Sequence, residues 1–224
     1  MIGFRIYELQ ERVSSAWVEK FRDIPVANIS DVMSRMSAGG AALRPMHAGG
    51  ALSGPAFTVR TRPGDNLMVH KALDMAQAGD VIVVDAGGDL SNAIIGELMV
   101  NTAMRRGLAG IIIHGAIRDI GTISRGRFPV YAGGITHRGP YKDGPGEINV
   151  AVSLGGMVVT PGDLIVGDED GLLCVPRKEA EAIHRAASEK QTLEARIMQD
   201  IMNDRLDVRW IDESLPQRGC DFAR

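Results

Sequence analysis

An arginine and an aspartate stand side by side at the end of the run His114-Gly115-Ala116-Ile117-Arg118-Asp119. The residues just before it, Ala109 to Ile113, form an apolar run that is typical of a buried strand. Ligands of open α/β sheets bind outside the carboxyl ends of the strands. At such a place Arg118 could hold a substrate carboxylate through two hydrogen bonds, and Asp119 could bind a divalent cation directly or through water. The alternative is a surface ion pair without a functional role.

A second candidate is the segment Gly96-Glu97-Leu98-Met99. If a helix begins at Gly96, the backbone N–H groups of Leu98 and Met99 are unpaired and form an anion-binding site. Gly96 has no side chain, so an anion could approach the backbone closely. If the helix instead begins near Ser91, the same N–H groups are bonded inside the helix and there is no such site. The periodicity leaves both possibilities open.

The other residues with chemical potential lack the spacing of a site. Four histidines are interpreted as surface or packing residues: His47, His70, His137 and His184. Three aspartates are interpreted as turn residues: Asp163, Asp168 and Asp170. Cys174 lies in an apolar run and is expected to be an unreactive core thiol. Glu189 and Glu194 are expected to be solvated, unless the helix that carries them reaches a neighbouring subunit.

Composition excludes several classes of protein. The chain has 224 residues, of which 45% are hydrophobic and 24% charged, so it can form a packed core. A net charge of -3 and only 4% aromatic residues argue against nucleic-acid binding. The two cysteines, Cys174 and Cys220, cannot build a disulfide framework, which favours a reducing cytoplasm. The charged N-terminus is unlike a signal peptide, and no run reaches the roughly 20 apolar residues of a membrane span.

The first part of the chain is expected to be helical. Apolar residues recur at helical spacing from Leu9 through Val13 and Trp17 to Phe21. Pro25 ends this helix, and the run from Asn28 to Asp31 offers cap residues for the next one. Residues 39–54 are predicted to be a loop with one short strand at most.

The centre of the chain alternates predicted strands with helices. Strands are expected over residues 56–61, 80–85, 109–113 and 128–131. Helices are expected over 67–78 and in a segment that ends at Arg105-Arg106-Gly107. This order is typical of parallel β/α units.

The pattern of the sequence changes after Gly133. Short β-like segments over residues 150–154, 157–160, 164–167 and 171–175 predict a β-meander. Pro176 then opens a long charged helix, Arg177 to about Arg205, and residues 207–224 are a polar tail. We therefore predict one mixed α/β domain over residues 1–224. An oligomer is expected because the long helix has apolar positions with nothing obvious to cover them: Ile183, Ala187, Leu193, Ile197 and Ile201.

Several short motifs follow one another in a recognisable order. They are Val83-Val84-Asp85, Gly96 to Met99, Arg105-Arg106-Gly107, Gly115 to Asp119, Pro161-Gly162-Asp163, and Gly167 to Gly171 before Val175-Pro176. In this order they resemble the RraA-like proteins, which include the 4-hydroxy-4-methyl-2-oxoglutarate / 4-carboxy-4-hydroxy-2-oxoadipate aldolases. The resemblance covers about residues 25–205.

The resemblance implies a swivelling β/β/α fold, assembly into trimers or hexamers, and an active site at a subunit interface. It implies a class II pyruvate aldolase of aromatic degradation that uses magnesium or manganese. Gly96, Glu97, Leu98 and Met99 would bind the pyruvyl carboxylate through their backbone, Arg118 would contact the substrate, and Asp119 would hold the metal. Glu189 or Glu194 of a neighbouring chain would assist the base. Oxaloacetate decarboxylation is an expected side reaction.

One departure from the family pattern concerns the residue before Gly115. The family commonly has aspartate there, and this chain has His114, which would weaken or alter the ordering of metal-bound water. Some family members instead inhibit a ribonuclease by protein contact. The alternatives to the aldolase are therefore a non-catalytic regulator of a ribonuclease, and a lyase for another keto acid. The long C-terminal helix favours the aldolase branch.

Overall fold

The computed structural model describes residues 2–221, which fall into two compact units. The first unit ends at Ala187 and the second begins at Ser188. The single domain over residues 1–224 stays a prediction. Among the described residues, no helix is long and apolar enough to cross a membrane.

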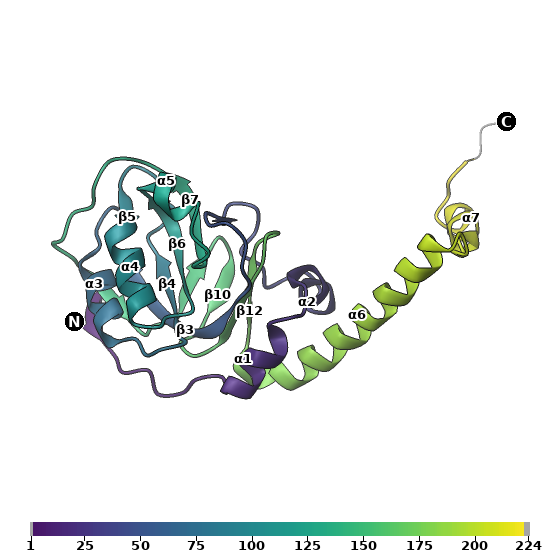
Figure 1. Ribbon diagram of the computed structural model, residues 1–224, viewed down its shortest axis with the longest axis horizontal. Helices are drawn as coiled ribbons and strands as arrows, with labels where there is room; N and C mark the ends of the chain where they lie inside the picture. Colours follow the sequence, from purple (N-terminus) through teal and green to yellow (C-terminus); the bar gives the residue numbers. More distant parts are fainter. Residues whose placement is uncertain (1, 222–224) are drawn as a thin grey trace. The chain divides into compact units, whose positions relative to one another are not determined.

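The first unit is built on one large mixed sheet (Figure 1). Its strands run in the order β1 (Phe4–Ile6), β8 (Gly146–Ile148), β3 (Leu52–Thr61), β4 (Val81–Asp85), β6 (Gly110–Ile117), β7 (Val130–Ile135) and β2 (Arg44–Pro45). The central strands β3, β4, β6 and β7 are parallel, and β5 (Ala93–Ile95) pairs with β6. The parallel β/α units predicted from the sequence are therefore confirmed.

The two faces of the sheet carry different cores because side chains alternate along each strand. Ile82 and Ile111 lie on the face that packs against α3 (Leu67–Met75) and α4 (Glu97–Arg105). Val81 and Ile112 lie on the opposite face, in a second cluster with residues of β9 (Val152–Leu154), β10 (Met157–Val159), β11 (Leu164–Gly167) and β12 (Leu172–Val175). The sheet is thus covered on both sides, and α5 (Ile120–Ile123) follows β6 directly.

The predicted β-meander is wrong. β9 and β10 form a separate two-stranded hairpin, whereas β11 and β12 form another that joins the large sheet. The reason lies in β3, which is 10 residues long. Its first half pairs with β11, and its second half pairs with β4 and β8.

The N-terminal helices also differ from the prediction. α1 covers only Ser15–Phe21, and the residues before it follow the surface, held by the side chain of Arg12 on Asp80. The expected cap residues Asn28 to Asp31 lie inside α2 (Val26–Val32), which Pro25 caps instead. The short strands β1, β5 and β8 were not predicted, because 3 residues are too few to show a period.

The long C-terminal helix is confirmed. A 3-10 turn over Arg177–Glu179 leads into α6 (Ala180–Met202), and the tail predicted to be merely polar contains α7 (Arg209–Gln217). The last residues of that tail, 222–224, lie outside the described residues. Ile183 and Ala187 pack in the first unit, whereas Leu193, Ile197 and Ile201 are exposed in the second.

Candidate active site

The Arg118–Asp119 pair lies at the carboxyl end of a central strand. β6 extends to Ile117, four residues further than predicted, so the pair follows it directly. The backbone N–H of Arg118 donates to the carbonyl of Ile95 (3.0 Å), which ties the pair to the neighbouring strand β5. Asp119 has a left-handed backbone (φ 58°), which a short polar side chain tolerates better than most. The chain therefore turns sharply at Asp119.

The start of α4 meets this pair. Gly96 is the N-cap of α4, which confirms the first of the two helix starts considered from the sequence. The N–H of Glu97 donates to Oδ2 of Asp119 (2.9 Å). The N–H of Met99 donates to the carbonyl of Gly96 (3.1 Å), so it is not free as predicted, because the first turn closes on itself. The N–H of Leu98 has no acceptor in the described part of the chain and stays available to an anion.

Gly96 allows the two segments to approach each other. A Cβ at this position would overlap the carboxylate of Asp119 and would lie 2.9 Å from Cγ of Arg118. Both contacts are closer than van der Waals radii permit. The glycine is therefore required by the close packing of the α4 N-terminus against the Arg118–Asp119 pair.

A cavity of about 260 Å³ opens over this junction. Gly96, Leu98, Met99, Arg118 and Asp119 line it, so five of the six predicted site residues face one space. Glu97 contributes its backbone N–H to Asp119, and its side chain is not part of the lining. The other walls come from β5, from α3 and the residue that precedes it, and from the loop between β7 and β8: Ile94, Ile95, Asn66, His70, Gly139, Pro140 and Lys142.

Asn66 presents an unsatisfied acceptor at the cavity wall. The residue is 2% exposed, and its Nδ2 donates to the carbonyl of Ile94 (2.9 Å). Since a carbonyl can only accept, this bond fixes which end of the amide carries the oxygen. Oδ1 is buried and has no hydrogen-bond partner. Buried acceptors of this kind are rare, and a donor from a bound ligand or water would satisfy it.

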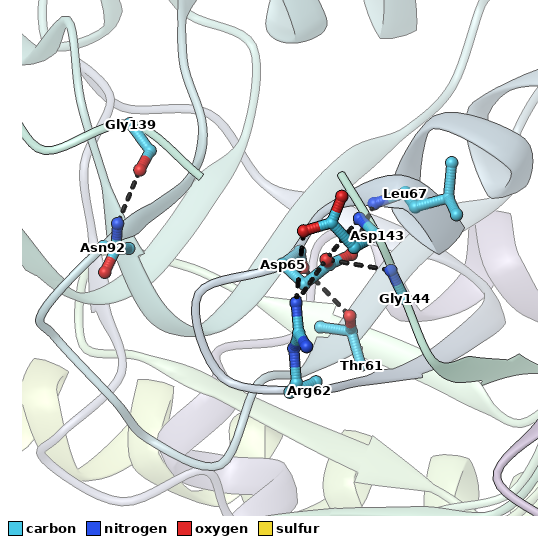
Figure 2. A network of polar contacts seen from close by, with 8 residues as sticks. All are labelled: Thr61, Arg62, Asp65, Leu67, Asn92, Gly139, Asp143 and Gly144. Carbon is cyan, nitrogen blue, oxygen red and sulfur yellow. Dashed lines mark hydrogen bonds and ion pairs between the residues drawn. The ribbon is translucent and has the colours of Figure 1, made fainter. Parts of the chain in front are cut away.

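A buried carboxylate holds the loop that closes the cavity (Figure 2). Oδ2 of Asp65 accepts the N–H groups of Asp143 (2.7 Å) and Gly144 (2.9 Å), and Oδ1 accepts that of Leu67 (2.9 Å). Burial raises the pKa of Asp65, but these donors and Arg62 together outweigh it and hold the pKa below its ordinary value. Asp65 is therefore ionised at neutral pH and fixes the loop beside the cavity.

A side-chain amide fixes the same loop at a second point. Nδ2 of Asn92 donates to the carbonyl of Gly139 (2.5 Å), as Figure 2 also shows. Gly139 in turn lies close to the guanidinium of Arg118, since a Cβ there would be 3.1 Å from Nη1. The loop thus positions one wall of the cavity against the guanidinium of Arg118.

His70 was interpreted from the sequence as a surface or packing residue, but it lies on the cavity wall. It stands one helical turn after Asn66, and its N–H donates to the carbonyl of Asn66 (3.1 Å). Burial and then the charge of Lys142 lower the pKa of His70. The sequence held one signal for these residues, the helix expected over 67–78, and it did not point to a site.

His114 and the C-terminal glutamates lie outside the cavity lining. Nδ1 of His114 is 3.3 Å from Oδ1 of Asp85, its register partner on β4. Its effect on a metal site stays a prediction. In the second unit, Glu189 lines a hollow of α6 and Glu194 pairs with Lys190 (2.9 Å).

The donor set can be tested against the expected metal. Among residues 2–221, no group of three or more His, Cys, Asp or Glu side chains could hold a metal ion. Asp119, however, uses only Oδ2 in its hydrogen bond with Glu97 and its ion pair with Arg118. Mg²⁺ typically keeps several waters and binds one or two carboxylates, and Mn²⁺ also prefers oxygen ligands. A hydrated magnesium or manganese ion therefore fits Asp119, whereas a closed zinc site does not.

The structural readings of two other residue types are confirmed. Cys174 is buried, and burial raises the pKa of its thiol, as expected of an unreactive core cysteine. Asp163 accepts the N–H of Arg177 (3.0 Å), and Asp168 accepts those of Val26 (2.9 Å) and Asp170 (3.0 Å). These aspartates fix turns and chain crossings.

Comparison with known proteins identifies a family model and named proteins that are similar to this chain. Residues 26–174 match the family model RraA-like, described as Aldolase/RraA. The chain is 41% identical over 175 residues to "Putative 4-hydroxy-4-methyl-2-oxoglutarate aldolase" of Halalkalibacterium halodurans, covering 78% of this chain and 83% of that protein. It is 38% identical over 112 residues to "4-hydroxy-4-methyl-2-oxoglutarate aldolase" of Thermus thermophilus, covering 50% and 68%.

Solved structures of similar fold confirm the predicted mixed α/β class. The structure of the RNA-processing inhibitor RraA from Thermus thermophilis has a TM-score of 0.63 and 31% identity, covering 69% of this chain and 93% of the other. Streptomyces coelicolor RraAS2, described as an unusual member of the RNase ES inhibitor RraA family, has a TM-score of 0.75 and 28% identity, covering 83% and 96%.

Proposed function

The chain belongs to the RraA-like (Aldolase/RraA) family, and we propose that it is a divalent-metal-dependent aldolase. It cleaves a 4-hydroxy-2-oxo acid, such as 4-hydroxy-4-methyl-2-oxoglutarate or 4-carboxy-4-hydroxy-2-oxoadipate, to pyruvate and a second keto acid. One observation carries the proposal: the Arg118–Asp119 pair and the N-terminus of α4 meet in one cavity of about 260 Å³. That combination offers an anion site, a cation and a metal-binding carboxylate to one small acid.

The carboxylate of the substrate binds at the start of α4. The free N–H of Leu98 and the positive end of the helix dipole attract it. The side chain of Arg118 is 42% exposed, and its Nε lies 3.8 Å from Oδ2 of Asp119. This is too far for a hydrogen bond, so the donors of Arg118 remain available to the substrate. Lys142 adds a second cation on the loop wall, which suits a substrate with a further carboxylate.

Asp119 would hold Mg²⁺ or Mn²⁺ through Oδ1 and its waters. When bound, the ion would polarise the 2-keto group and stabilise the enolate that C–C cleavage leaves. Arg118 faces the same space and stabilises the negative charge that develops on the substrate oxygens. Oxaloacetate decarboxylation follows from the same chemistry, since it passes through the same pyruvate enolate.

The proposal is tested by pyruvate release, coupled to lactate dehydrogenase, from both 4-hydroxy-2-oxo acids and from oxaloacetate. Measurements with Mg²⁺, with Mn²⁺ and with EDTA should show metal-dependent release. Arg118→Lys and Asp119→Asn should each lower it by roughly 10²-fold or more. The matched control is the exposed Asp207–Arg209 ion pair, where Asp207→Asn and Arg209→Lys should leave turnover unchanged. Full activity of the Arg118 and Asp119 variants, or full activity in EDTA, would refute the proposal.

Two structures of similar fold support a second candidate, a regulator that binds a ribonuclease. One is described as an RNA-processing inhibitor and the other as a member of an RNase ES inhibitor family. A regulator would form its complex without metal and without the catalytic pair. A pull-down with a ribonuclease of the RNase E type should then succeed in EDTA and with Asp119→Asn. No complex with the wild-type chain would exclude this candidate.

We further propose that the chain assembles into a trimer or hexamer. The exposed side chains Leu193, Ile197 and Ile201 support this, because a row of apolar residues on a helix favours a protein partner. Light scattering that gives the mass of a monomer would refute it.

A further inference from the structure

We propose that His70 is the base that takes the proton of the substrate's 4-hydroxyl group as the C3–C4 bond breaks. This inference rests on the proposed aldolase function and adds a catalytic residue to it. Arg118 and Asp119 account for the pyruvyl half of the substrate, but neither is a base for the other half. Arg118 is a permanent cation, and Asp119 is committed to Glu97 and to the expected metal.

The position of His70 suits this role. His70 lies on α3 and lines the active cavity together with Arg118 and Asp119. It also lines a second hollow of about 240 Å³ between α3 and α4, and Leu98 and Met99 line both spaces. His70, Leu98 and Met99 therefore lie on the boundary between the active cavity and this second hollow.

The roles proposed above for Leu98 and Asp119 define a placement for the substrate. Its carboxylate and 2-keto group belong at the N–H of Leu98 and beside Asp119, for the reasons given above. C4 is two bonds from C2, so its hydroxyl stays in the cavity, and the remainder of the chain extends toward the second hollow. That path passes the imidazole. The ring of His70 has no hydrogen-bond partner in the described part of the chain, so both nitrogens are available to the substrate.

The charges around His70 favour a neutral ring. The charged groups that line the two hollows are Arg118, Asp119, Lys142, Asp74 and Arg106. Burial, followed by the charge of Lys142, holds the pKa of His70 below its ordinary value of 6.5. The ring is therefore mostly unprotonated at pH 7, which is the form that accepts a proton.

The proton balance of the step is complete without a further reactant. The 4-hydroxyl proton moves to the imidazole, and the C4–O bond becomes the carbonyl of the released keto acid. The electrons of the C3–C4 bond remain on C3 as the enolate of pyruvate. The imidazolium then returns its proton to C3, which gives pyruvate and restores His70.

Oxaloacetate provides an internal control for this step. Its C4 is a carboxylate, so the C3–C4 bond breaks with loss of CO₂, and no hydroxyl proton has to be removed. The enolate that remains can take a proton from water. A true 4-hydroxyl base is therefore needed for aldol cleavage but not for decarboxylation, whereas a merely structural residue would affect both reactions alike.

The test compares the two reactions in His70→Gln, with Mg²⁺ present, across a range of pH. We expect kcat for aldol cleavage to fall about 10²-fold, with oxaloacetate decarboxylation close to wild type. In the wild type, protonation of His70 should lower kcat/KM at acid pH. This fall should be absent in His70→Gln. His137→Gln is the control, because this exposed histidine lines neither hollow. In His70→Ala, added imidazole should restore part of the aldol rate.

Three results would overturn the inference. The first is an equal loss of both reactions in His70→Gln, which would make His70 a structural or binding residue. The second is an aldol rate that stays at the wild-type level. The third is a wild-type enzyme that releases pyruvate from neither substrate, which alone would also overturn the proposed function.

Discussion

Two of the Arg–Asp pairs in the molecule have opposite character. In the first, Arg12 donates two hydrogen bonds to Asp80, from Nε to Oδ1 (2.8 Å) and from Nη2 to Oδ2 (3.0 Å). In the second, Nε of Arg118 is 3.8 Å from Oδ2 of Asp119, which is beyond hydrogen-bond distance. The carboxylate of Asp80 is 1% exposed, and that of Asp119 is 40% exposed.

The difference shows what turns a pair of residue types into a candidate site. Asp80 also accepts the N–H of Gln77 (2.9 Å), and its hydrogen bond with Arg12 raises the pKa of the guanidinium. Both oxygens are occupied, so this pair joins the N-terminal segment to the sheet and can bind nothing else. Asp119 keeps Oδ1 available, and Arg118 keeps its donors toward the cavity. The open pair can bind a ligand because its members do not satisfy each other.

Asp119→Asn gives the largest expected effect. The amide oxygen can still accept the N–H of Glu97, and asparagine tolerates the left-handed backbone at this position. The fold should therefore persist, while the charge that would hold the metal is lost. We expect kcat for pyruvate release to fall by roughly 10²- to 10³-fold or more, as when a key electrostatic group is removed from an active site.

Stability is the control for that variant. The midpoint of urea unfolding should stay close to that of the wild type, since the substitution is partly exposed. A variant that loses activity and unfolds at much lower urea would show that the open pair is structural after all.

Breaking the closed pair should have the reverse outcome. Arg12→Leu leaves the buried carboxylate of Asp80 without its cation, which costs about 3 kcal/mol in the free energy of unfolding. Urea unfolding measures this loss, and kcat per folded molecule should not change. A selective loss of activity without loss of stability would contradict the contrast between the two pairs.

The sequence predicted the open pair better than its surroundings. Arg118 and Asp119 could be located because a long apolar strand precedes them. Gly96 depended on one of two possible helix starts, and the periodicity did not decide between them. The prediction of a free N–H at Met99 was wrong, because the first turn of α4 closes on itself. The periodicity of a sequence does not show such a local detail. Asn66, His70 and Lys142 could not be found, because they reach the cavity from segments far apart in the sequence.

The same limit applies to the fold. The central strands β4, β6 and β7 carry continuous apolar runs, so their existence and parallel order followed from the sequence. The meander failed because the pairing of β11 with β3 joins residues more than 100 positions apart. The helix expected from Leu9 failed because ion pairs hold residues 11 and 12 in an extended path.

Gly96→Ala tests whether the close contact of the α4 N-terminus with the Arg118–Asp119 pair is needed for activity. The added methyl group overlaps the Asp119 carboxylate and must push the open pair away from α4. We expect kcat to fall about tenfold to a hundredfold, with a stability cost of about 1–3 kcal/mol. Gly121→Ala is the matched control, because a Cβ there meets no atom within 4 Å and its activity should be unchanged. Equal activity of the two variants would show that the contact at Gly96 is dispensable.

Asp65, like Asp80, is a buried carboxylate whose oxygens are both hydrogen-bonded. Removing its ion pair with Arg62 should have the smallest effect on stability. In Arg62→Gln the three backbone donors to Asp65 remain, so we expect a loss near 0.5 kcal/mol, typical of an ion pair with one exposed partner. The pKa of Asp65 is lower in the folded chain than its ordinary value of 3.8, so its ionised form contributes stability above that pH. This contribution disappears as the pH falls through the lowered pKa, and the difference between Arg62→Gln and wild type should vanish with it. Urea unfolding at several pH values measures that difference, with the exposed Arg105→Gln as the control. A difference that persists unchanged in strong acid would show that Arg62 stabilises the loop through packing and not through the charge of Asp65.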